Sequence, residues 1–255
     1  MNREMKPVPK KSKLKIVSEW DQIAALRHQQ IQSGKDLSYR FVILPCVLSL
    51  VRGSDMTSVI DVGCGTGALT SRLARTADRI VGVDLSAEHI RIAASAYSGL
   101  TNASFVTSSI EAYSKTAPPR SVTLAVANMT LMTILNLDSA LRALARILAP
   151  GGHFVFTITH PFFWPLYWGY GRKKWFNYRS EIKIEAPFNI SLEKTRGYVT
   201  THVHRPLERY CASLSRVGFV IEALREPLPT GTIQVKYPEQ WRYPRFLGAK
   251  CRLLF

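Results

Sequence analysis

The chain has 255 residues, of which 46% are hydrophobic, and this length suits one α/β domain with an embellishment. It has no run of about 18 apolar residues, so no membrane-spanning helix is expected, and its basic start lacks the apolar segment of a secretory signal. A net charge of +16 suits an anionic partner such as RNA, an anionic membrane or an acidic small molecule, or only a solvated surface.

The first fifty residues predict a tail followed by helices. Residues 1–15 hold six Lys and Arg against one Glu, with two prolines, and we expect a basic flexible tail there. Apolar residues recur at near-helical spacing over 17–32, and a second helix is expected over 38–52. The four cysteines have no C-x-x-C spacing, so we expect no metal site and no disulfide scaffold, and a cytoplasmic location with reduced thiols.

Strands and helices then alternate. Strands are expected at 58–62, 79–84, 103–107, 121–127 and 153–159, with helices at 66–76, 87–97 and 137–148. An aromatic-rich insert at 160–205 breaks this rhythm before a helix at 206–216 and strands at 217–224 and 248–255. The pattern predicts one domain over 16–255: helices at 16–52, a core at 53–159, the insert at 160–205 and closing elements at 206–255. Its fold class is α/β, doubly wound, with a mainly parallel sheet.

A glycine-rich turn follows the first of these strands. The stretch Asp61-Val-Gly63-Cys-Gly65-Thr-Gly67 joins a strand to a helix, and Asp84 lies at the end of the next strand. Glycines allow a ligand close to the backbone, and a carboxylate at Asp84 can accept two ribose hydroxyls. The same glycines also fit a dinucleotide fingerprint. Asp61 favours a ligand with a cationic amino group, because its carboxylate would repel a pyrophosphate.

This stretch resembles the first signature of the class I S-adenosylmethionine-dependent methyltransferases. The segments at 81–86, 105–111, 126–129 and 148–152 are similar to later signatures of that family, and the resemblance is close over 58–160. It implies a seven-stranded Rossmann-like sheet, S-adenosylmethionine as cofactor and S-adenosylhomocysteine as product. Ser109 departs from the family pattern, because many members have an acidic residue there, although a hydroxyl can still accept a hydrogen bond from adenine.

The resemblance also implies the residues that hold the cofactor. Backbone at the glycines approaches the methionine part, Asp61 meets its amino group, Asp84 holds the ribose, and Leu85, Ser109 and Ile110 surround the adenine. The implied set is Tyr39, Asp61, Gly63, Cys64, Gly65, Asp84, Leu85, Ser109, Ile110, Asn128 and Met129. Tyr39 lies in the stretch that precedes the first signature, where family members often have an aromatic residue over the methionine carboxylate. Alternatively, Tyr39 only packs within its helix.

The insert is the expected acceptor side, because ligands of such sheets bind outside the carboxyl ends of the strands. Nine aromatic residues fall within 162–178. They could form a lid or wall that excludes water from the reaction, or they could simply pack on the sheet. The substrate-binding candidates are Phe162, Phe163, Trp164, Tyr167, Trp168 and Tyr170.

Three histidines are candidate general bases, because an imidazole titrates near neutral pH. His160 is the first choice, since it directly follows the strand at 153–159. His202 and His204 share one face if their segment is extended. Each of the three could instead be a structural histidine.

We therefore expect methyl transfer to an O, N or activated C atom of a small, aromatic or lipophilic acceptor. The alternatives are an RNA methyltransferase, which the charge suggests, and a non-catalytic cofactor-binding module.

Overall fold

A computed structural model describes residues 5–255, apart from the side chains of 194–196. Seven strands form its large sheet, in the order β4 (Ala103–Thr107), β3 (Arg79–Asp84), β2 (Ser58–Val62), β5 (Val122–Asn128), β6 (Leu148–Thr159), β10 (Phe246–Leu253) and β9 (Phe219–Arg225). The first five are parallel, and β10 runs antiparallel to both of its neighbours. The predicted α/β class with a mainly parallel seven-stranded sheet is confirmed.

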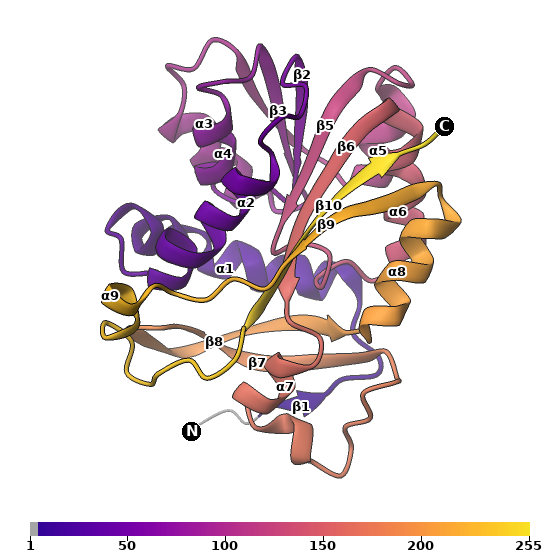
Figure 1. Cartoon of the computed structure of the whole chain (residues 1–255). Helices are drawn as coiled ribbons and strands as arrows, with labels where there is room; N and C mark the ends of the chain where they lie inside the picture. Colours follow the sequence, from indigo (N-terminus) through magenta and orange to yellow (C-terminus); the bar gives the residue numbers. More distant parts are fainter. Residues whose placement is uncertain (1–4) are drawn as a thin grey trace.

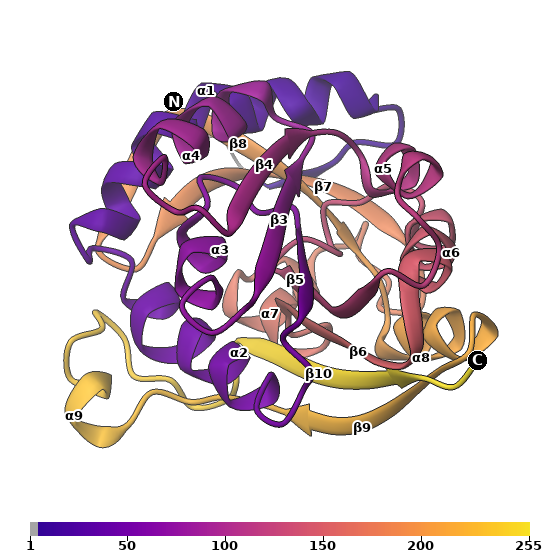
Figure 2. The ribbon, with the colours of Figure 1, turned by 90° about the horizontal axis from the view of Figure 1, so that it is seen from above.

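Helices cover both faces of this sheet because its strands are apolar on both sides. One face packs on α2 (Leu44–Leu50), α3 (Ala68–Leu73) and α4 (Ala87–Ala96), and the other packs on α5 (Ile110–Thr116), α6 (Leu137–Ile147) and α8 (Leu207–Arg216) (Figures 1 and 2). Successive residues of β2 point to opposite faces of the sheet. Val59 packs with residues of α2 and α3 on one face, and Ile60 packs with residues of α6 on the other.

A second, three-stranded sheet lies below the first in the view of Figure 1. It consists of β1 (Lys6–Pro7), β7 (Ile182–Ile190) and β8 (Glu193–His204), all antiparallel. The long helix α1 (Lys13–Gln32) packs on both α4 and β8, and so lies between the two sheets. Shorter elements are the π-helix Tyr39–Ile43, α7 (Phe163–Tyr167), the 3-10 turn Tyr170–Arg172 and α9 (Gly231–Gln234). No described helix is long and apolar enough to cross a membrane.

The structure corrects the predicted tail over 1–15. Residues 1–4 lie outside the described residues, but β1 pairs with β7, and α1 already begins at Lys13. The side chain of Lys11 is buried between the carboxylates of Glu19 and Glu185, and Lys6 also pairs with Glu185. A local count of charges cannot show these pairings, because the partners lie far apart in the sequence.

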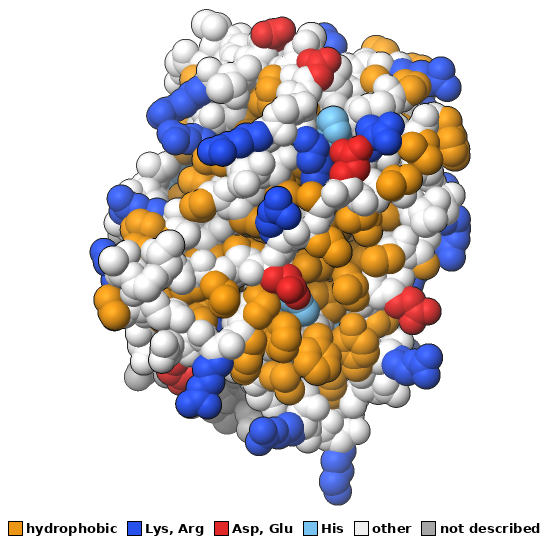
Figure 3. Space-filling model, viewed as in Figure 1, with side chains coloured by type: hydrophobic (Ala, Val, Ile, Leu, Met, Phe, Trp, Pro, Cys, Tyr) orange, Lys and Arg blue, Asp and Glu red, His pale blue; other side chains and the backbone are white. Residues whose placement is uncertain are grey.

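The predicted insert at 160–205 contains structure that its composition did not indicate. It holds α7, the 3-10 turn and the β7–β8 hairpin. Outside the insert, the structure also has helix α5, which the sequence pattern does not predict. Hydrophobic side chains gather on the surface around and above α7 (Figure 3). Phe162, next to this helix, and Leu166, within it, are exposed. Lysines and arginines are scattered over the same face rather than gathered in one stripe.

Candidate functional site

The turn between β2 and α3 is shaped by its glycines. Gly63, Gly65 and Gly67 have positive φ angles of 67°, 54° and 79°, which other residues rarely adopt. A Cβ at Gly63 would lie 2.9 Å from Cβ of Thr130 and closer still to its Cγ2 and Oγ1. At Gly65 an added Cβ would meet nothing within 4 Å, and Gly65 lines a large cavity, so the missing side chain leaves room for a ligand.

Asp84 ends the next strand with a carboxylate held in one orientation. Its Oδ2 accepts a hydrogen bond from the backbone N–H of Gly65 at 2.9 Å, and its Oδ1 accepts one from Ser86 at 2.8 Å. Asp84 lines the same cavity. Since a carboxylate oxygen has two lone pairs, both oxygens can still accept hydrogen bonds from ligand hydroxyls.

Asp61 is a buried carboxylate with one oxygen free. Its Oδ2 accepts a hydrogen bond from Oγ1 of Thr70 at 2.7 Å, whereas Oδ1 has no partner among the described residues. Burial raises the pKa of Asp61 to about 7, against the hydrogen bond from Thr70 and with help from the charge of Asp84. A cationic ligand group in the cavity would satisfy Oδ1 and favour the ionised carboxylate. The buried hydroxyl of Tyr39, which also lines the cavity, lacks a partner too.

Ser109 and Asn128 also line the cavity. The hydroxyl oxygen of Ser109 accepts a hydrogen bond from the N–H of Ala112 at 3.1 Å and so caps helix α5. Oδ1 of Asn128 accepts a hydrogen bond from Oγ1 of Thr157 at 2.7 Å, which fixes the amide beside the cavity. Met129 has a φ of 55°, an uncommon backbone conformation for a residue other than glycine.

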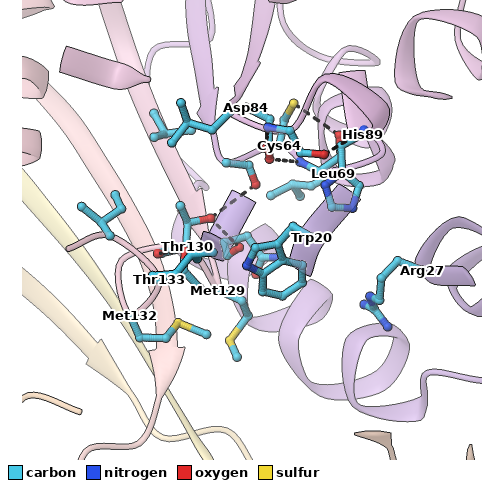
Figure 4. Close-up of a pocket in the computed structure, with 18 of the residues that line it drawn as sticks. Trp20, Arg27, Cys64, Leu69, Asp84, His89, Met129, Thr130, Met132 and Thr133 are labelled. Carbon is cyan, nitrogen blue, oxygen red and sulfur yellow. Dashed lines mark hydrogen bonds between the residues drawn. The ribbon is translucent and has the colours of Figure 1, made fainter. Parts of the chain in front are cut away.

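These residues surround one cavity of about 710 Å³. All eleven residues expected to hold the cofactor line it: Tyr39, Asp61, Gly63, Cys64, Gly65, Asp84, Leu85, Ser109, Ile110, Asn128 and Met129. Figure 4 shows Asp84, Met129 and Trp20 around the same space, with Trp20 contributed by α1. Residues 188–191, at the end of β7 and in the turn after it, also line the cavity, so it lies between the two sheets.

The aromatic residues of the insert divide into two groups. Trp164, Tyr167 and Trp168, which α7 and its C-cap contribute, line the cavity. Phe162, Phe163 and Tyr170 do not: Phe162 is exposed, Phe163 stacks on Tyr243 with ring centroids 5.2 Å apart, and Tyr170 is buried against Trp175. Three of the six substrate-binding candidates therefore line the cavity, and the other three lie outside it.

His160 lies at the end of β6 as expected, but its ring is fully engaged. Nδ1 accepts hydrogen bonds from the N–H groups of Phe162 and Phe163, both at 3.2 Å, and Nε2 lies 2.8 Å from Oε1 of Glu226. This pattern fits a neutral ring that donates from Nε2. Burial lowers the pKa of His160, although Glu226 opposes the shift. His160 does not line the large cavity, so its role as a base stays a prediction without geometric support.

His202 and His204 do share one face of β8, as alternation predicts, but that face packs on residues 170–178 of the same insert. Nε2 of His204 donates to the carbonyl oxygen of Tyr178 at 2.9 Å, and the ring of His202 lies beside Tyr170. Burial lowers the pKa of both histidines, to about 4 for His202. Neither histidine lines the large cavity.

The structure adds cavity residues that the sequence did not single out. They include Trp20, Arg27, His89, Phe188 and Arg245. Arg27 pairs with Asp36 at 2.9 Å, and Trp20 contacts both His89 and Phe188. Trp20 belongs to the apolar pattern of its helix, but nothing in that pattern shows that the helix crosses the cavity.

Comparisons with known proteins agree with this geometry. Residues 54–163 match a family model described as a methyltransferase domain. A ubiquinone biosynthesis O-methyltransferase of Serratia proteamaculans (strain 568) is 31% identical over 101 residues, which are 39% of this chain and 42% of that protein. The matched part thus spans less than half of that curated relative.

Solved structures match over more of the chain. The crystal structure of an S-adenosylmethionine-dependent methyltransferase from Mesorhizobium loti is 25% identical and has a TM-score of 0.63, with coverage of 82% of this chain and 96% of that one. A structure from Listeria monocytogenes, at 22% identity and a TM-score of 0.64, covers 81% of this chain and 95% of that one, and shows the fold alone.

Proposed function

We propose that this chain is a class I S-adenosylmethionine-dependent methyltransferase, and that it methylates an oxygen, nitrogen or activated carbon of a small apolar acceptor. The observation that carries the proposal is the single cavity that reaches from the glycine turn and Asp84 to the aromatic side chains of α7. A methyl donor and its acceptor must meet in one water-poor space for in-line transfer.

The residues present fit the cofactor. The bare backbone at Gly65 leaves room beside the turn, the oriented carboxylate of Asp84 suits two ribose hydroxyls, and the free oxygen of Asp61 suits an ammonium group. When bound, S-adenosylmethionine supplies an electrophilic methyl group with a good leaving group. The chain itself positions the acceptor and excludes water, with Trp20 and the α7 aromatics as walls.

The acceptor side of the cavity sets the chemistry that we propose. Its lining is apolar and aromatic at Trp164, Tyr167 and Trp168, and none of the three candidate base histidines reaches it. We therefore propose that the acceptor brings an atom that needs little help to lose its proton, and that the enzyme acts by positioning. Curated relatives named as ubiquinone biosynthesis O-methyltransferases favour oxygen among the three atom types.

The test is calorimetry with S-adenosylmethionine. We expect binding, and we expect Asp84→Ala to weaken it by about 1–3 kcal/mol through the lost hydrogen bonds. Asp78→Ala, an exposed aspartate just before β3, is the matched control and should bind as the wild type does. No binding at hundreds of micromolar cofactor would reject the proposal.

RNA methylation is a second candidate, and the net charge of +16 is the observation that favours it. It predicts RNA binding that falls steeply between about 50 and 200 mM salt. Binding that does not change with salt, or no RNA binding, would remove this candidate.

A further inference from the structure

Arg245 is a buried arginine on the wall of the large cavity. It directly precedes β10, is only 6% exposed, and lines the cavity. Its guanidinium carbon lies 3.5 Å from the ring centroid of Tyr167 and 4.2 Å from that of Trp241. Two aromatic rings therefore contact the planar head group and hold it in place.

No carboxylate among the described residues forms an ion pair with this guanidinium. Burial lowers the pKa of Arg245, and Glu239 acts on it only at longer range, but an arginine still remains charged at neutral pH. Arg205, another deeply buried arginine, is paired with Glu181 at 2.8 Å and donates to several backbone carbonyls. Because a buried unpaired charge is costly, Arg245 calls for an anionic partner that the chain does not provide.

A second donor without a partner belongs to a residue that lines the same cavity. Nε1 of Trp168 is buried and has no hydrogen-bond partner among the described residues. Its ring lies 6.4 Å from that of Tyr167, which in turn contacts Arg245. An indole N–H and a guanidinium are both donors only, so neither group can satisfy the other.

The position of Arg245 places it on the acceptor side. β10 lies three strands from β2 in the sheet, roughly 14 Å away at the usual strand spacing. The backbone N–H of His160, at the end of β6, donates to the carbonyl oxygen of Arg245, and Trp164 of α7 contacts Phe246. Arg245 therefore lies next to α7 and away from the glycine turn that receives the cofactor.

We propose that Arg245 binds an anionic group, a carboxylate or a phosphate, of the methyl acceptor. Guanidinium groups bind both anions through two parallel hydrogen bonds, and the aromatic walls suit an apolar body attached to the anion. This inference rests on the proposed function, since it names the acceptor class of the same cavity.

The experiment titrates the protein, with and without saturating S-adenosylhomocysteine, with two matched pairs of probes. One pair is 2-naphthoate and 2-naphthamide, and the other is 2-naphthyl phosphate and 2-naphthol. We expect at least one anion to bind about tenfold or more tightly than its neutral partner, and the pair that shows this tells a carboxylate from a phosphate. Arg245→Met should abolish the preference, and Arg245→Lys should keep part of it. Arg242→Met, an exposed arginine three residues earlier, should leave it unchanged.

The outcomes separate this inference from the proposed function. If S-adenosylhomocysteine binds but no probe binds, or the preference survives in Arg245→Met, the inference is wrong and the proposed function stands. Weaker S-adenosylhomocysteine binding by Arg245→Met would place the arginine on the cofactor instead and would also overturn the inference. If the anions bind through Arg245 while S-adenosylhomocysteine does not bind, the anion site stands and the proposed function falls.

Discussion

The imidazole of His160 and the carboxylate of Glu226 lie 2.8 Å apart and connect the end of β6 to the segment that follows β9. With Nδ1 held by two backbone N–H groups, the ring has no free lone pair with which to take a proton from an acceptor. The contact thus favours a structural role for His160 over the role of a base.

His160→Ala should therefore lower stability more than turnover. We expect a loss of about 1–3 kcal/mol in the free energy of unfolding, because two part-buried backbone N–H groups lose their acceptor, and a turnover within about threefold of wild type. Denaturant unfolding and the pH profile of turnover measure the two effects. A fall in turnover of roughly 100-fold or more with cofactor affinity unchanged would instead make His160 the base.

Cofactor binding should release a proton from Asp61. Burial raises its pKa to about 7, so the free protein holds much of this carboxyl protonated at pH 6.5, and a bound ammonium group would ionise it. Affinity for S-adenosylmethionine should consequently rise as the pH rises through about 7 and fall in more acid solution. Calorimetry in buffers of different ionisation enthalpy measures the released protons, and Asp61→Asn should release none. Equal proton release by Asp61→Asn and wild type would refute this assignment.

Gly63→Ala should damage the cofactor site. The new methyl group would clash with Thr130 in a backbone conformation with positive φ, and we expect a loss of about 2 kcal/mol or more in unfolding free energy. Gly151→Ala is the matched control, since Gly151 also has positive φ but has nothing within 4 Å of an added Cβ. The control should lose only the backbone cost of about 1–2 kcal/mol and should bind the cofactor normally. Equal stability of the two variants would contradict the close approach of Thr130.

His202 should make the fold sensitive to acid. Its pKa is about 4 in the folded protein, because burial excludes the charged form, against about 6.5 in the unfolded chain. The unfolded state thus binds more protons below pH 6.5, so the contribution of His202 is complete above that pH and is lost as the pH falls toward 4. Between pH 7 and pH 4, His202→Gln should lose roughly 2–3 kcal/mol less unfolding free energy than wild type, as measured by denaturant unfolding. A constant difference between the two proteins across this range would show that His202 is not buried in its neutral form.

The sequence was sufficient for the core strands, whose signals are local, and the family resemblance picked out residues that line one cavity. Runs of β-branched and apolar residues fixed the bounds 58–62, 79–84 and 103–107 as the structure has them. The glycine turn and Asp84 lie within one strand–turn–helix–strand unit, so their spacing already places them at one edge of the sheet.

The acceptor half depends on contacts between distant segments. Trp20, Phe188 and Arg245 come from three parts of the chain that meet only when the small sheet and β10 are in place. The position of His160 at a strand end was predicted, but the contact with Glu226 that engages its ring was not. Lys11 was assigned to a tail because its partners, Glu19 and Glu185, lie on other elements.

The central claim is methyl transfer to a small acceptor, and one measurement tests it most directly. S-adenosylmethionine with a labelled methyl group is incubated with the protein and an extract of cells that make it, and the label is counted in the small-molecule and RNA fractions. We predict label in the small-molecule fraction, reduced about fivefold or more for Asp84→Ala at limiting cofactor. Label confined to RNA, or no label in either fraction above that of Asp84→Ala, would contradict the account.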